Sequence, residues 1–523
     1  MRHLILPLAG VAAVALAVTV GISSHSRAQP AAVPLYHDLG DYHYGITTAV
    51  PLAQQYFDQG LRLYYAFNHA EAIRAFREAQ RLDSDCAMCW WGEALSWGPN
   101  INLPMDTPSA EAAYAAIEQA LARRTHASPR EQALIDALAT RYAAAAPEDR
   151  AHLDQAYADA MAKVVADFGD DHDIQVLYAE ALMDLSPWDY WTGQSTPRPH
   201  IEIGLGHLEQ VLTADEQHPG ACHFYIHAVE EVFPERAVPC AERLARLMPG
   251  AGHLVHMPGH IYIRVGRYLD AVEANAHAVH ADETYIQDQM PGMGMYTAGY
   301  YPHNYDFMAF AAMMIGRSTT AIDSAKKVTS LLPPELFGSP GMDFLQHWSV
   351  RPLHMQIRFA RWQDILAQPQ PQPQQSNLYA LGIWHYARGR AFVGTGNFNA
   401  AEQELSQVRG LLRRPELAAL KMEFNQSNNL LAIGDKVLSG WLAAGRGNYE
   451  LAVAELEQAV LLEDALKYGE PPEWSIPTRQ DLGSVLLKAG RPAAAENVFR
   501  QDLAKFPENG WSLHGLYQSL RDQ

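Results

Sequence analysis

The chain has 523 residues, 48% hydrophobic and 19% charged, which is enough for a large core, several domains or a repeat array. Acidic residues outnumber basic ones by 59 to 39, and the formal net charge is −20. This charge argues against nucleic acid as a partner and against binding to an anionic membrane surface.

Residues 1–28 have the pattern of a signal peptide. Arg2 gives a short basic start, residues 4–20 form an apolar run, and Ser26-Arg27-Ala28 fits a small-x-small cleavage site. The run is short for a membrane span, so we expect export to the periplasm or out of the cell. An uncleaved signal segment is the alternative, and it would be the chain's one link to a membrane. Residues 29–50 are predicted to form an N-terminal arm.

Helical patterns begin at residue 51 and continue to the C-terminus. Apolar residues recur at spacings of three and four between Gly and Pro breaks, and no convincing run of alternating strands is present. A short turn recurs before segments with small residues on one face. The turns are Gly266-Arg267-Tyr268, Gly316-Arg317-Ser318, Ala360-Arg361-Trp362, Gly396-Asn397-Phe398, Gly447-Asn448-Tyr449 and Gly490-Arg491-Pro492.

These turns, with the spacing of Tyr56, Gly60, Ala72 and Phe76, resemble the tetratricopeptide repeat, a helix–turn–helix unit of about 34 residues. Trp90 to Leu95, Gly98 to Asn102 and His256 to Tyr268 further resemble motifs of exported bacterial tetratricopeptide-repeat proteins. The resemblance implies an all-α fold, a right-handed superhelix (α-solenoid) of helix hairpins, and no particular activity.

After the N-terminal arm, the chain is predicted to have four parts. Residues 51–215 are predicted to be an N-terminal helical segment, partly irregular, and residues 216–365 a central histidine-rich segment. Residues 366–376 have the Pro/Gln composition of an exposed linker, and residues 377–523 are predicted to be C-terminal repeats.

Export would permit disulfides among the four cysteines. Cys86 and Cys89 form a C-x-x-C pair, which fits a strained disulfide, a redox pair or two small core residues. We favour a structural role. Cys222 and Cys240 are placed to bridge two antiparallel helices.

Histidines gather in the central segment. His223 and His227 are four residues apart, and His253, His256 and His260 follow at spacings of three and four, so each set would line one face of a helix. In tetratricopeptide repeats, positions 2, 5 and 9 of the first helix face the concave groove. Here the turn register fills these positions in three units with His253, His256 and His260, with His303, Asp306 and Phe310, and with His347, Val350 and His354.

Clustered imidazoles point to a transition metal, because imidazole is the commonest protein ligand for zinc, copper and iron. The predicted ligands are His223, His227, His256 and His260, with His253 or His303 as a further ligand or support. Glu230 and Asp306 are the candidate catalytic carboxylates, as ligands, imidazole orienters or bases. Whether His347 and His354 join the same pocket stays open.

Two neighbouring features qualify this prediction. Met290, Met293 and Met295 precede His303, and thioethers beside imidazoles favour copper slightly over zinc or iron. Pro258 stands between His256 and His260, so we expect a kink or a late helix start there.

Two classes of function fit these patterns. The first is an exported repeat protein with a metal in a histidine-rich groove, used as an oxidoreductase or a hydrolase on a small-molecule substrate. The alternative is a scaffold that binds a peptide or protein partner, whose histidines form a structural or acid–base network. The sequence does not decide whether the chain is an enzyme.

Overall fold

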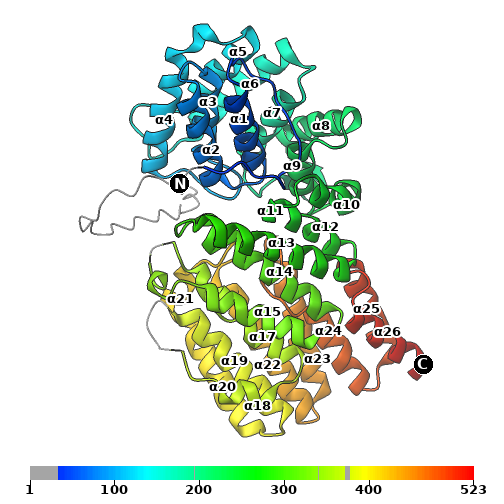
Figure 1. The fold of residues 1–523 in the computed structure, drawn as a ribbon. Helices are drawn as coiled ribbons and strands as arrows, with labels where there is room; N and C mark the ends of the chain where they lie inside the picture. The colour runs from blue at the N-terminus through cyan, green and yellow to red at the C-terminus, as the bar shows by residue number, and fades with distance from the viewer. Residues whose placement is uncertain (1–32, 194, 340, 372–376) are drawn as a thin grey trace, which may run out of the picture. The chain divides into compact units, whose positions relative to one another are not determined.

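The computed structural model describes residues 33–193, 195–339, 341–371 and 377–523, which are almost entirely helical (Figure 1). The predicted signal peptide and part of the Pro/Gln linker lie outside these residues. The chain forms two compact units: among the described residues, the first contains 33–37 and 41–224, and the second contains 225–523 together with 38–40. No helix in the described ranges is long and apolar enough to span a membrane.

The first unit consists of consecutive antiparallel helices and one short hairpin. Strands β1 (Trp191–Thr192) and β2 (Thr196–Pro197) pair antiparallel. The helices are α1 (Pro51–Tyr65), α2 (His69–Leu82), α3 (Ala87–Ser96), α4 (Thr107–Ala122), η1 (Arg124–His126), α5 (Pro129–Ala139), α6 (Ala151–Phe168), α7 (His172–Met183), α8 (Pro199–Ala214) and the start of α9 (Pro219–Val229).

The second unit continues from the end of α9 to the C-terminus. Its elements are η2 (Pro234–Ala237), α10 (Val238–Leu247), α11 (Gly252–His256), α12 (Pro258–Arg264), α13 (Tyr268–Gln289), the π-helix η3 (Tyr296–Tyr300), α14 (Tyr301–Met314), α15 (Ser318–Leu331), η4 (Pro334–Leu336), α16 (Phe344–Ser349), α17 (Arg351–Arg358), α18 (Trp362–Ala367), α19 (Leu378–Gly394), α20 (Phe398–Leu412), α21 (Pro415–Ala419), α22 (Ser427–Gly445), α23 (Tyr449–Asp464), α24 (Thr478–Lys488), α25 (Pro492–Lys505) and α26 (Gly510–Asp522).

The six predicted turns are the corners of the helix hairpins. The first residue of every turn has a positive φ, from 53° at Ala360 to 81° at Gly266, and the next helix begins two residues later. Glycine adopts this left-handed conformation without the steric cost that a Cβ adds, which is why five of the six residues are glycine. The predicted all-α array of tetratricopeptide-like hairpins is thereby confirmed.

Close packing within the first hairpins depends on small residues. A Cβ added to Gly60 of α1 would lie 2.7 Å from the Phe76 ring of α2, and one added to Gly92 of α3 would lie 2.4 Å from it. The Phe76 ring therefore fills space that only glycine leaves open on both neighbouring helices.

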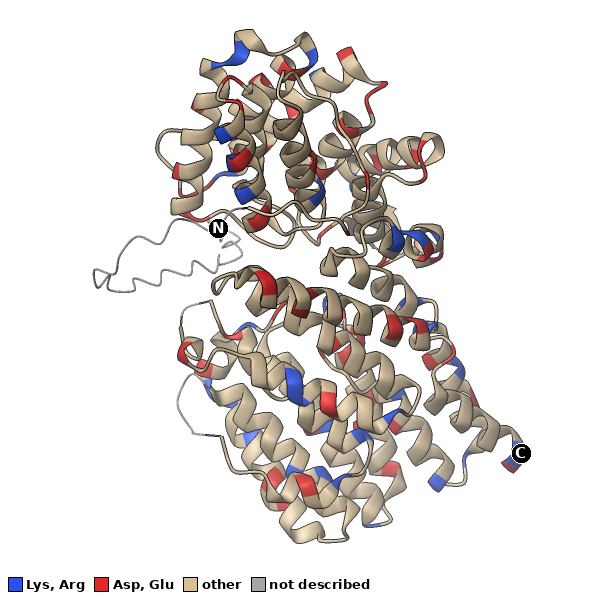
Figure 2. Ribbon diagram, viewed as in Figure 1, with Lys and Arg blue, Asp and Glu red and all other residues tan. Residues whose placement is uncertain are grey.

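The border between the two compact units lies a few residues C-terminal to the predicted segment boundary. The border between them falls at residues 224 and 225, whereas the predicted central segment starts at residue 216. Residues 225–365 and 377–523 therefore belong to the same unit, and only residues 216–224 of the predicted central segment belong to the first unit. In the described part of the chain, basic residues are interspersed among acidic ones along the helices of each unit (Figure 2).

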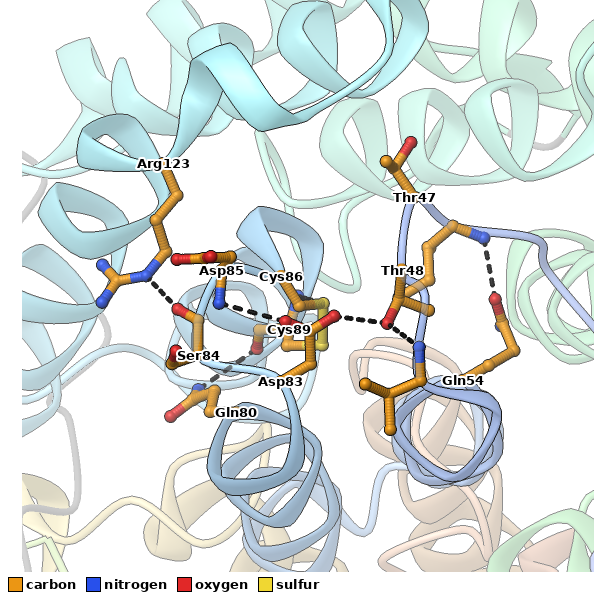
Figure 3. The surroundings of a disulfide bond; sticks show 12 residues. Thr47, Thr48, Gln54, Gln80, Asp83, Ser84, Asp85, Cys86, Cys89 and Arg123 are labelled. Atoms are coloured by element: carbon orange, nitrogen blue, oxygen red, sulfur yellow. Dashed lines mark hydrogen bonds between the residues drawn. A yellow bond between two sulfur atoms is a disulfide. The ribbon is translucent and has the colours of Figure 1, made fainter.

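Cys86 and Cys89 form a disulfide at the start of α3, where Cys86 is the N-cap (Figure 3). Both cysteine side chains are buried in a core cluster with Ala53, Tyr56 and Ala79. Val33, Leu35 and Ile46 of the N-terminal arm pack against this cluster. The burial supports a structural role for the pair. Cys240 is a buried free thiol, so the bridge considered between it and Cys222 is not formed.

Candidate metal centre

The helix that carries the H-M-P-G-H motif is interrupted at its proline, as expected. Helix α11 ends at His256, and α12 begins at Pro258, whose ring cannot donate a backbone hydrogen bond. The backbone stays helical through Met257, and His260 N donates to Met257 O at 3.1 Å. The break therefore leaves the two histidine side chains on the same side.

His256 and His260 face each other through their outer nitrogens, with the two Nε2 atoms 2.9 Å apart. His256 Nδ1 lies 2.7 Å from Asn275 Oδ1, and the Asn275 amide donates to Ala271 O at 2.8 Å. Since the Asn275 amide nitrogen is already used as a donor, its oxygen accepts from His256 Nδ1–H. A neutral His256 therefore presents the Nε2 lone pair to His260.

A glycine in the same motif makes this contact possible. A Cβ added to Gly259 would lie 2.6 Å from Asn275 Nδ2. Only glycine therefore lets α13 bring its amide side chain this close to α12.

His303 of α14 completes a group that we call the trihistidine cluster: His256, His260 and His303. One nitrogen of each ring lies within 4.8 Å of the others, and the His303 ring centroid is 5.1 Å from that of His256. His256 and His260 are buried, and His303 is half-buried. Burial, followed by the charge of His260, holds the pKa of His256 and of His303 well below the ordinary value.

Two buried carboxyl groups meet the opposite nitrogen of His260. His260 Nδ1 lies 2.9 Å from Glu230 Oε2 and 3.0 Å from Glu470 Oε2. Burial opposes a charge on His260, but the two carboxylates outweigh burial and raise its pKa to about 9. Burial raises the pKa of both glutamates.

Other groups surround the cluster. The Phe307 ring lies 4.6 Å from the His256 ring and 4.5 Å from the His260 ring, which gives the site an apolar wall. The His227 ring is 5.4 Å from that of His260, and the His253 ring is 5.8 Å from that of His256. Both histidines are buried next to the trihistidine cluster.

Several other residues singled out in the sequence do not belong to the trihistidine cluster. His223 belongs to the first unit, where its Nδ1 lies 2.7 Å from Tyr65 O. Asp306 is ion-paired with Arg351, whose Nη2 is 2.8 Å from Asp306 Oδ2. Met290 is 81% exposed, and Met293 and Met295 are also exposed.

His347 and His354 flank Arg351 and are buried too. His354 Nδ1 lies 3.3 Å from Ser475 Oγ, which also accepts from Arg351, and His347 Nδ1 lies 3.3 Å from the Tyr379 hydroxyl. Burial, with the nearby Arg351 charge, lowers the pKa of His354 to about 3. These side chains surround the Arg351–Asp306 pair and not the trihistidine cluster.

Sequence reasoning missed Asn275 and Glu470. Asn275 had a local signal, because it is a polar residue in the buried stripe of α13 that also carries Ala271 and Ala278. Glu470 had none, since it lies in the loop between α23 and α24, far along the chain from His260.

No protein-family model and no curated protein sequence matches this chain. Solved structures similar to it include the APC/C hetero-tetramer Cut9–Hcn1, at 13% identity over 90% of this chain and 76% of that chain, with a TM-score of 0.33. The human IFIT1 dimer with m7Gppp-AAAA matches at 12% identity over 91% of each chain (TM-score 0.32). Yeast Tom70 matches at 12% over 90% and 95% (TM-score 0.28). These low scores carry no argument about what this chain binds.

Proposed function

We propose that this array of helix hairpins binds one transition metal ion through Nε2 of His256, Nε2 of His260 and a ring nitrogen of His303. The observation that carries the proposal is the pair of facing Nε2 atoms, 2.9 Å apart, on rings whose Nδ1 atoms lie beside Asn275 and beside the two glutamates. Metal-bound histidines usually have this arrangement, in which the second nitrogen donates to an amide or carboxylate oxygen.

The separation of the two nitrogens also suits a shared ion. Two nitrogens bound to one metal at about 2.0–2.1 Å lie about 2.8–3.4 Å apart for bond angles between a right angle and the tetrahedral value. His303 supplies the third nitrogen. A four-coordinate ion held by three protein ligands keeps its fourth position for water or a small-molecule substrate.

The ligand set fits copper, zinc or iron. Its three imidazoles by themselves do not separate these metals, and the exposure of the three methionines removes support for thioether ligation. With an open position, the ion would serve an oxidoreductase or a hydrolase, and Glu230 would act as an imidazole orienter.

A second function competes with this one: a partner-binding scaffold whose histidines form an acid–base network. The contacts of His260 with His256, Glu230 and Glu470 also fit this function, because they need no metal. A doubly protonated His260 would donate through Nε2 to His256 and through Nδ1 to the glutamates. A stripe of exposed apolar residues on α26, formed by Leu513, Tyr517 and Leu520, offers a surface for a partner.

Metal analysis of the full mature chain, purified without a histidine tag, separates the two functions. We expect at least one copper, zinc or iron per chain, and loss of one ion in a His256→Ala/His303→Ala variant that keeps its helicity by circular dichroism. His385→Ala is the matched control, because His385 is a buried histidine paired with Glu404 in the same unit. No bound metal, and none taken up on titration with Cu²⁺ or Zn²⁺ at neutral pH, would exclude the metal site and leave the acid–base scaffold.

A further inference from the structure

We propose a second cation site on the other side of the His260 ring, formed by His260 Nδ1, Glu230, Glu470 and His227. It rests on the proposed function through the shared ring: His260 would bridge two ions, one at each nitrogen. The second ion would be a divalent transition metal that accepts oxygen ligands, such as zinc.

The two carboxylates are each anchored by one oxygen and present the other to His260. Glu470 Oε1 accepts a hydrogen bond from the Tyr468 hydroxyl and lies 3.7 Å from Arg264 Nε, while its Oε2 is 3.0 Å from His260 Nδ1. Glu230 Oε1 lies 3.4 Å from His227 Nδ1, while its Oε2 is 2.9 Å from His260 Nδ1. Three ligand atoms from three segments of the chain thus converge.

The converging atoms are close without being aligned as hydrogen-bond partners. Glu230 Oε2, Glu470 Oε2 and His260 Nδ1 are all buried, and none has a well-oriented hydrogen-bond partner among the described residues. Buried polar atoms are almost always satisfied, and an unsatisfied one costs about 1–3 kcal/mol. Atoms 2.9–3.0 Å apart have the spacing of neighbouring ligands on one ion.

Charge supports the same interpretation. A single imidazole N–H would have to satisfy two carboxylates at once, and the nearest other cation is Arg264, 3.7 Å from the far oxygen of Glu470. Two carboxylates in a buried site are costly unless positive charge lies between them, and a single imidazolium balances only one of the two. A divalent cation would balance both.

His227 supplies the fourth ligand. A ring nitrogen of His227, an oxygen of Glu230 and a nitrogen of His260 lie within 4.8 Å of one another. The set of two nitrogens and two oxygens is harder than the three imidazoles of the trihistidine cluster, so the two sites would differ in metal preference.

Occupation of both sites changes the protonation of His260. When each nitrogen binds an ion, the proton that Nδ1 would otherwise carry leaves to solvent, and the ring bridges the ions as an imidazolate. The metals would then lie about 6 Å apart, given two metal–nitrogen bonds of about 2 Å and the width of the ring.

The first test is the stoichiometry of Zn²⁺ binding to the full chain, followed by titration and metal analysis. We expect two ions per chain in the wild type, one in Glu470→Gln, and one in His303→Ala. Glu473→Gln is the matched control, because Glu473 is a buried glutamate in the same loop, bound to Asn425 instead of His260. It should keep both ions. Glu230→Gln serves as a second variant and should also bind one.

Loading with Cu²⁺ gives an independent readout. Two coppers joined by an imidazolate couple magnetically, so the wild type should show a weakened Cu²⁺ electron paramagnetic resonance signal, and Glu470→Gln should restore an uncoupled one-copper signal. A wild type that binds a single ion with equal affinity in Glu470→Gln would overturn this inference and leave the trihistidine site standing. A single ion lost in both Glu470→Gln and His303→Ala would also overturn it. Absence of any binding would overturn both proposals.

Discussion

His256 and His260 meet through their Nε2 atoms at 2.9 Å even though Pro258 breaks the helix between them. Helix α12 starts directly at the proline and continues the turn of α11, so the i, i+4 relation of the two side chains survives. On the opposite side of each ring, His256 Nδ1 contacts Asn275, and His260 Nδ1 lies beside Glu230 and Glu470.

Asn275 should control metal affinity without being a ligand. Asn275→Ala removes the acceptor that orients His256 Nδ1–H, and the loss of such a partner typically weakens metal binding 10–100-fold. Titration with Zn²⁺ or Cu²⁺ measures the change. Asn304→Ala is the control, since Asn304 is a buried amide on α14 that donates to Asp282 and not to a histidine. Equal affinity in the wild type and Asn275→Ala would contradict the assigned role.

Asp306 should behave as half of a buried ion pair. Arg351→Ala leaves the Asp306 carboxylate buried without its partner, which typically costs about 3–5 kcal/mol. Denaturant unfolding of the full chain, followed by circular dichroism, measures the loss. The double variant Arg351→Met/Asp306→Leu should recover most of the stability that Arg351→Ala loses, because no unpaired charge remains. If the double variant is as unstable as Arg351→Ala, the pair has a role beyond charge balance.

Reduction of the Cys86–Cys89 disulfide should lower stability by a modest amount. The bond closes a loop of only four residues, for which the chain-entropy model gives roughly 2 kcal/mol. The melting temperature of a Cys86→Ala/Cys89→Ala variant should therefore fall by a few degrees, and reductant should have no further effect on it. A loss of the whole fold in this variant would show that the disulfide does more than tie the start of α3.

The first unit should become more stable as the pH falls from 8 toward 5. Burial raises the pKa of Asp173 from 3.8 to about 7, although Tyr42 and Tyr65 donate hydrogen bonds that oppose the shift. Because the folded state then holds a proton that the unfolded state has lost, this contribution is complete below about pH 4 and is lost as the pH rises through 7. A pKa difference of about three units between the folded and unfolded states limits the contribution of Asp173 to the free energy of unfolding to about 4 kcal/mol.

The neighbouring His218 has the opposite effect: it lowers the stability of the first unit as the pH falls. Burial lowers its pKa to about 4, so the unfolded state binds its proton first as the pH falls below 6.5. Melting temperatures of the wild type and Asp173→Asn across pH 5–8 separate the two effects. The wild type should lose stability relative to Asp173→Asn as the pH rises, and parallel curves would contradict the assignment.

The helix hairpins could be predicted because their determinants are local. Gly266, Gly316, Gly396, Gly447 and Gly490 occupy turns where φ is positive, and a few neighbouring residues suffice to specify such a turn. The same register predicted that His256, His260 and His303 share a face, and the structure brings these three rings together. Cooperation of His223 with them stays a prediction.

The sequence alone thus determined the helical class, the hairpin corners and the histidine stripes, since backbone sterics and residue spacing act over a few positions. Only the tertiary structure decided that Glu470 meets His260, that Asn275 orients His256, and that Arg351 pairs with Asp306. Each of these contacts joins different elements, and side-chain partners across elements depend on how the helices and loops pack together.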